Sequence, residues 1–125
     1  PPESVVEGAP VAPPLPPVTT VAEWKRKAQA RYRVALPSGA VVIARRADVP
    51  RLMGERRIAP ELFQSAGTSE ERYAMLREAA KATAPLIVVE PILTADDVSS
   101  LLEGDLTTLF MWATGLAAIP AEEVV

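Results

Sequence analysis

Residues 31–62 read RYRVALPSGAVVIARRADVPRLMGERRIAPEL, and this stretch decides the fold. Large side chains at Tyr32, Val34 and Leu36 alternate with Arg33 and a small alanine, which is the period-two pattern of a half-buried strand. The next three residues, Pro-Ser-Gly, predict a tight turn, because proline presets φ and glycine accepts a positive φ. Residues 40–46 are rich in β-branched side chains and predict a returning strand. The stretch therefore begins with a β-hairpin that packs one apolar face on helices.

A short helix is predicted directly after the hairpin. Asp48 is a natural N-cap, and Pro50 falls in the first helical turn, where its missing N–H costs little. Residues 51–53 continue the helix and Gly54 weakens it. A second helical turn is expected to begin at Pro60. Nothing in this part of the sequence predicts catalysis.

A helix is also predicted before the hairpin. Thr20 and Glu23 have the spacing of a capping box, so the helix begins there and ends near Arg31, where the strand pattern starts. Trp24 is expected to anchor this helix against the hairpin.

Two more helices are predicted in the middle of the chain. The capping-box pattern Thr68–Glu71 opens the clearer one, which spans about residues 69–83 and is ended by Pro85. The apolar run at residues 86–89 fits either a buried strand or an extended connector, and periodicity does not distinguish them. A short helix is expected at residues 94–102, before Gly104.

The last helix, about residues 105–116, has the strongest apolar pattern, and its main stripe comprises Leu106, Leu109, Phe110, Ala113 and Ala117. Trp112 extends the stripe on one side, and Met111 points roughly opposite. No charged residue occurs between Leu106 and Ala121. Such a helix is either central in the fold or covered by a partner, and the sequence leaves both open.

The chain divides into three parts: a proline-rich extended leader at residues 1–20, a single α+β domain at 21–119 that is mostly helical with one β-hairpin near its start, and a short tail at 120–125. The leader holds seven of the thirteen prolines, so it cannot form a helix interior or a paired strand. It is expected to be flexible, to be held by a neighbouring chain, or to dock as a polyproline II segment through residues 13–17. The 125 residues, 49% of them hydrophobic, suffice for one core.

Composition argues against catalysis and against a cofactor or metal site. The chain has no cysteine and no histidine, so the usual thiolate nucleophile, general base and zinc ligands are missing. The first two acidic pairs, Glu70-Glu71 and Asp96-Asp97, fall in first turns of predicted helices, where capping explains them; the third, Glu122-Glu123, lies in the predicted tail. No secretory signal is recognised, and no run reaches the roughly 18 apolar residues that predict a membrane span. A non-enzymatic interaction protein is therefore expected, in the cytoplasm or in a virion.

Charge is unevenly distributed along the chain. Residues 23–57 carry ten basic and three acidic side chains, a net of +7, whereas residues 58–125 carry three basic and eleven acidic ones, a net of −8. Few aromatic residues accompany the basic half, and no reader motif or phosphate loop occurs, which argues against nucleic acid. Intramolecular pairing, or head-to-tail contact between copies in a homo-oligomer, explains the asymmetry better.

Four of these segments resemble the tail assembly chaperones of long-tailed bacteriophages, especially phages of actinobacteria. They are the turn Leu36–Gly39, the basic segment Arg45–Asp48, the loop Ile58–Leu62 and the helix Asp105–Gly115 with its pattern DLTTLFMWATG. They occur in the expected order and span most of residues 31–116. The proline-rich leader and the absence of an initiator methionine depart from the family's pattern.

The resemblance implies a chaperone of the host cytoplasm that binds apolar helical segments of the tape-measure protein and helps to recruit tail-tube subunits, without a nucleotide. The residues expected to bind partners are the exposed apolar Met111 and Trp112 and a basic set: Arg45, Arg46, Arg56 and Arg57. The alternative is a structural virion component, such as a tail, connector or capsid-associated protein, that uses its leader as an arm on neighbouring subunits. A host-directed adaptor that presents a proline-rich ligand is a third reading.

Overall fold

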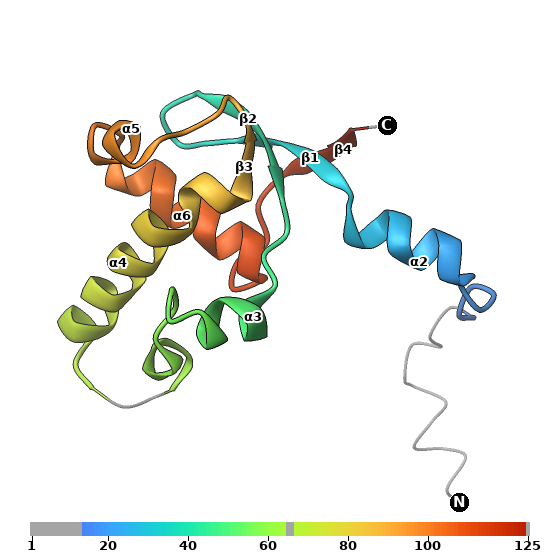
Figure 1. The fold of residues 1–125 in the computed structure, drawn as a ribbon, viewed down its shortest axis with the longest axis horizontal. Helices are drawn as coiled ribbons and strands as arrows, with labels where there is room; N and C mark the ends of the chain where they lie inside the picture. Colours follow the sequence, from blue (N-terminus) through green and yellow to red (C-terminus); the bar gives the residue numbers. More distant parts are fainter. Residues whose placement is uncertain (1–13, 65–66, 125) are drawn as a thin grey trace, which may run out of the picture.

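The computed structural model describes residues 14–64 and 67–124, and it is a small α+β domain in which about half of these residues are helical. Residues 1–13 of the predicted leader lie outside the described residues, and residues 14–20 are exposed and form no helix or strand. The elements in chain order (Figure 1) are α2 (Val21–Ala28), β1 (Arg31–Ala35), β2 (Val41–Arg45), α3 (Val49–Gly54), the 3₁₀ turn η1 (Pro60–Phe63), α4 (Ser69–Ile87), β3 (Val88–Glu90), α5 (Ala95–Ser99), α6 (Glu103–Thr114) and β4 (Ala121–Val124).

β1 and β2 form the predicted hairpin, with Val34 opposite Val42. Leu36 closes the turn with two backbone hydrogen bonds: its N–H donates to the carbonyl of Ala40 (2.8 Å), and its carbonyl accepts from the N–H of Gly39 (2.9 Å). Gly39 has a φ of 94°, a left-handed conformation that glycine adopts without strain. Because Val34 is fully buried, one face of the hairpin belongs to the core, as expected.

The sheet has four antiparallel strands in the order β3-β2-β1-β4, two more than the predicted hairpin. β4 lies within residues 120–125, which were expected to be a tail. Its sequence, AEEV, has no alternation that predicts a strand, and the pairing comes from the open edge of β1, where Arg33 lies opposite Glu122. β3 uses the second half of the apolar run at residues 86–89 and pairs with β2.

α4 begins as predicted but ends later. The hydroxyl of Thr68 accepts a hydrogen bond from the N–H of Glu71 (3.1 Å) and caps the helix. The predicted end near Thr83 is wrong, because the helix continues through Pro85 to Ile87. A proline in the last turn removes only one hydrogen-bond donor, and burial of Ile87 helps to offset that loss.

α6 is the central helix of the domain. Of the two explanations for its uncharged sequence, a central position or cover by a partner, the structure shows the first. It packs against α4, and both helices lie next to the sheet (Figure 1). Gly115 ends α6 in a left-handed conformation with a φ of 78°. The α6 residues that are buried are Leu106, Thr107, Leu109, Phe110, Trp112 and Ala113. None of the helices in residues 14–64 and 67–124 combines the length and the hydropathy that a membrane span requires.

The hairpin turn is bonded to the start of α6. One carboxylate oxygen of Asp105 accepts from the backbone N–H of Ser38 (3.0 Å), and the other accepts from the Ser38 hydroxyl (2.5 Å). Further along, the N–H of Ala47 donates to the carbonyl of Ala113 (3.0 Å). The hairpin and its following loop are thus attached to both halves of α6.

Arg46 covers the largest buried side chain of α6. Its guanidinium lies 4.3 Å from the ring centroid of Trp112 and 5.6 Å from that of Tyr32, and its Nη1 donates to the carbonyl of Trp112. The Tyr32 and Trp112 rings meet edge to face at 5.4 Å. This geometry combines a cation–π contact with an aromatic pair, so Arg46 has a structural role.

α2 stands away from the rest of the domain at the start of β1 (Figure 1). Thr20 caps it as predicted, accepting from the N–H of Glu23 (3.2 Å). None of its residues is buried, and Trp24 is 71% exposed. The expectation that Trp24 anchors this helix on the hairpin is therefore wrong, because α2 leads away from the core.

The bond between turn and helix predicts a measurable loss of stability on Asp105→Ala. The substitution removes both acceptors for Ser38 and a negative charge near the N-terminus of α6, so we expect a loss of about 1–2 kcal/mol in urea unfolding. Ser38→Ala removes the hydroxyl bond alone and should cost less. An unchanged urea midpoint for Asp105→Ala would show that this bond contributes nothing.

The stacking geometry predicts that Arg46→Lys is not a conservative change. Lysine keeps the charge but lacks the planar guanidinium that stacks on Trp112, so we expect a loss of about 1 kcal/mol. In a Trp24→Phe background, the emission of Trp112 should also shift. The matched control is Arg45→Lys, which should leave that emission unchanged, and equal effects of the two variants would contradict this role of Arg46.

Candidate functional site

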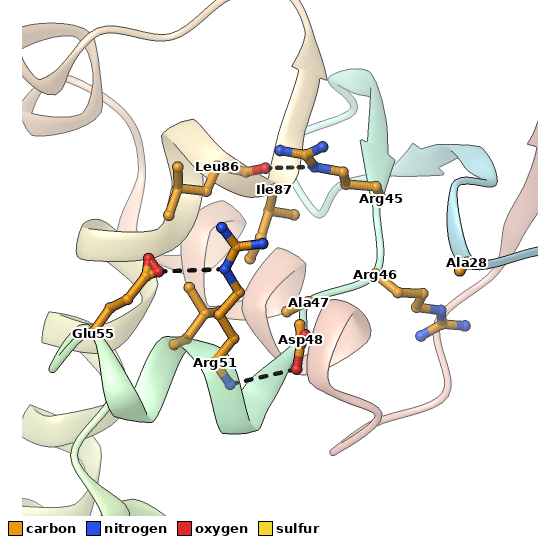
Figure 2. Close-up of a pocket in the computed structure, with 10 residues that line it drawn as sticks. Ala28, Arg45, Arg46, Ala47, Asp48, Arg51, Glu55, Leu86 and Ile87 are labelled. Carbon is orange, nitrogen blue, oxygen red and sulfur yellow. Dashed lines mark hydrogen bonds and ion pairs between the residues drawn. The ribbon is translucent and has the colours of Figure 1, made fainter. Parts of the chain in front are cut away.

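A cavity of about 310 Å³ opens beside the end of β2 (Figure 2). Its walls come from β2 and the loop after it, from α3, from the last turn of α4, and from the end of α2. The ten lining residues are Ala28, Arg45, Arg46, Ala47, Asp48, Arg51, Leu52, Glu55, Leu86 and Ile87. We call this cavity the arginine pocket, because three of its five charged residues are arginines.

The floor of the arginine pocket is apolar. Leu52 and Ile87 are buried, and Ala47 and Leu86 are partly buried against the same core. Leu52 reaches this position because Asp48 caps α3, accepting from the backbone N–H of Arg51 (3.4 Å). The accessible apolar surface of the floor therefore comes from Ala47 and Leu86, and such surface favours an apolar group as the occupant.

Arg45 reaches the pocket from the last residue of β2. Its Nε donates to the carbonyl of Leu86 (3.0 Å), in the last turn of α4, where a positive charge is favoured by the helix dipole. Figure 2 shows the guanidinium held over the pocket by this bond. Because Nε makes the bond, the two terminal nitrogens of Arg45 are available to a ligand.

Arg51 faces Arg45 from α3. Its side chain is 77% exposed, and its Nε lies 3.7 Å from the carboxylate of Glu55, one turn further along the helix. Exposed ion pairs of this kind are weak, so Arg51 can exchange Glu55 for an incoming carboxylate at little cost. Arg46 turns to the other side, toward α2 (Figure 2).

The pocket therefore suits a particular kind of ligand. Guanidinium groups bind carboxylates with two parallel hydrogen bonds, and Arg45 and Arg51 extend toward the same opening. An apolar side chain would lie on the floor while an adjacent carboxylate meets these arginines. A peptide segment that alternates apolar and acidic residues has this chemistry.

The structure divides the basic residues that were expected to bind partners. Arg45 and Arg46 line the arginine pocket, whereas Arg56 and Arg57 line a second hollow of about 430 Å³ against α4. The Nε of Arg57 lies 4.0 Å from a carboxylate oxygen of Glu55. The same carboxylate pairs with Arg51 in the arginine pocket. The four arginines therefore form two pairs that lie on two separate hollows.

Met111 and Trp112 line neither of these hollows. Trp112 was expected to be exposed, but it is only 1% exposed. The reason is that α6 is central in the domain. Tyr32 of β1 and the guanidinium of Arg46 cover the face of α6 that carries Trp112. Met111 is partly buried.

Two features of the site were not predicted from the sequence. Arg51 was placed in a helix but not in a binding site, and the carbonyl of Leu86 that orients Arg45 became available only because α4 continues past Pro85. No spacing in the sequence brings Arg45 and Arg51 together, because Arg45 ends β2 and Arg51 lies on α3.

The pKa of Asp97 is lowered, because the Thr94 backbone N–H and side chain form hydrogen bonds in the capping box of α5. This residue lies outside the arginine pocket. Among the described residues, no group of three or more acidic, histidine or cysteine side chains is placed to hold a metal ion.

Comparison with known proteins gives no relative for this chain: no protein-family model, curated protein or solved structure matches it.

Proposed function

We propose that this protein is a tail assembly chaperone of a long-tailed bacteriophage, acting in the host cytoplasm on the tape-measure protein and tail-tube subunits. The proposal rests on the resemblance of the turn, the basic segment, the loop and the last helix, together with one structural observation. That observation is the arginine pocket, which combines an apolar floor with a basic rim.

The position of the pocket supports the proposal. Three of the segments that carry the resemblance lie together: the turn contacts the last helix through Ser38 and Asp105, and the basic segment contacts it through Arg46 and Trp112. The basic segment Arg45–Asp48 then forms one wall of the pocket. The residues that resemble the family thus build the core and a binding surface together.

The pocket also supports a specific mode of binding. A chaperone for tape-measure segments must cover apolar side chains of a helix that also carries charges for solubility. In the proposed complex, an apolar residue of the partner lies on Ala47 and Leu86, which are only partly buried, and a neighbouring carboxylate bonds to Arg45 and Arg51. No catalytic step and no cofactor is involved.

A structural virion component is the second candidate, and a different observation favours it. α2 and residues 14–20 before it stand away from the domain, with Leu15, Val18 and Trp24 exposed. An element of this kind suits an arm that lies on a neighbouring subunit. Mass spectrometry of gradient-purified phage particles separates the two: a chaperone should be absent from particles, whereas a structural protein should be present at fixed stoichiometry.

The pocket predicts that charge reversal at Arg51 weakens partner binding. Arg51→Glu should reduce the affinity for a tape-measure fragment roughly tenfold, because it replaces an attraction by a repulsion at the rim of the pocket. Its side chain is largely exposed, so the fold should be unaffected. Isothermal titration calorimetry at two salt concentrations measures the effect, which should shrink at high salt.

The matched control is Arg72→Glu, which makes the same charge change at an exposed position of α4 outside both hollows. It should leave the affinity within about twofold of the unchanged protein. Equal loss in both variants would mean that net charge, and not the pocket, controls binding. Failure of the unchanged protein to bind or solubilise the fragment would overturn the chaperone proposal itself.

A further inference from the structure

α2 presents an apolar stripe that nothing in the described structure covers. Val21, Trp24 and Ala28 share one face of this helix, and Lys25 and Lys27 flank them. Val21 is 66% exposed and Trp24 is 71% exposed. An isolated helix of eight residues is marginal in water, because the cost of helix nucleation is repaid by packing. A stable α2 therefore requires something to pack on this stripe.

The far end of the molecule presents a second apolar surface, around α5. Ile92, in the segment that enters α5, is 86% exposed. Leu101 and Leu102, in the segment that leaves it, are 42% and 64% exposed. Figure 1 shows α5 and α2 toward opposite ends of the long axis of the molecule. We call the surface formed by residues 90–102 the α5 corner.

The two surfaces carry opposite charge. The α5 corner has three exposed acidic residues, Glu90, Asp96 and Asp97, and its exposed positions include no basic residue. α2 has three consecutive basic residues, Lys25–Lys27, beside its apolar stripe. In the described part of the chain, none of these charges takes part in an ion pair. Each surface therefore has both apolar area and unpaired charge to offer a complementary partner.

We propose that α2 of one copy docks on the α5 corner of a second copy, head to tail. Trp24 and Val21 would cover Ile92 and Leu102, and the lysines of α2 would face the carboxylates of the corner. The two surfaces cannot meet within one chain, because they lie at opposite ends of it. Contact between two α2 helices is disfavoured, because it brings like charges together.

The geometry of this contact determines the assembly. A head-to-tail interface uses two different surfaces, so a dimer still has one free α2 and one free α5 corner. Growth therefore continues until a ring closes or a filament forms. The apolar area on each side is small, so a single contact is weak and concentration-dependent. The paired charges make it weaker as salt increases. This proposal is independent of the arginine pocket and of the tape-measure partner.

Sedimentation velocity over a concentration series of the full chain tests the proposal. The arm variant carries Trp24→Ser and Lys25→Glu, and the corner variant carries Ile92→Ser and Asp96→Lys. Both change exposed side chains only, and circular dichroism with thermal unfolding checks that the core is intact. Arg72→Glu on α4 is the control for a charge change elsewhere.

The unchanged protein and the Arg72→Glu control should gain average mass with concentration, and this gain should be lost in high salt. Each of the two variants alone should remain a monomer. Mixed in equal amounts, they should form a dimer and nothing larger, because one intact α2 meets one intact corner. A monomeric unchanged protein overturns the proposal, as does a corner variant that still assembles, or a mixture that stays monomeric.

Discussion

The burial of α6 against the hairpin is the interaction on which the rest of this structure depends. Trp112 lies against Tyr32, and Arg46 closes over both rings while bonding to the backbone of α6. At the other end of the helix, Asp105 accepts two hydrogen bonds from the turn. A helix held at both ends fixes the direction of the chain after β2, which positions Arg45 and α3 around the arginine pocket. The arginine pocket is therefore a consequence of how the core is closed.

Arg45 and Arg46 show how neighbouring arginines come to have different roles. Strand geometry sends successive side chains in opposite directions, so Arg46 reaches the aromatic rings of the core while Arg45 reaches the end of α4. The first is largely committed to stability, and the second retains free hydrogen-bond donors. A basic pair in the sequence thus supplies one residue that packs on the core and one that keeps free donors at the arginine pocket.

Local signals in the sequence predicted the elements that local interactions determine. The Pro-Ser-Gly turn and the caps at Thr20, Asp48 and Thr68 are all present. What the sequence could not predict depends on distant contacts: β4 forms only because β1 has an open edge, and α4 passes Pro85 because its last turn is buried. For the site, the basic segment was recognised, but the pocket was not, because its floor comes from α3 and α4. The uncharged face of α6 indicated burial without showing whether the core or a partner supplies it.

Hydrogen–deuterium exchange of the full chain, alone and without partners, tests most directly whether α6 is the centre of the fold. If it is, the amides of α6 and of the β1–β2 hairpin should exchange slowest and at similar rates, since only unfolding of the whole domain exposes them. α2, which has no buried residue, should exchange much faster at low protein concentration. Fast exchange throughout α6 would contradict the account, because it would mean that this helix is held in place only when a partner covers it.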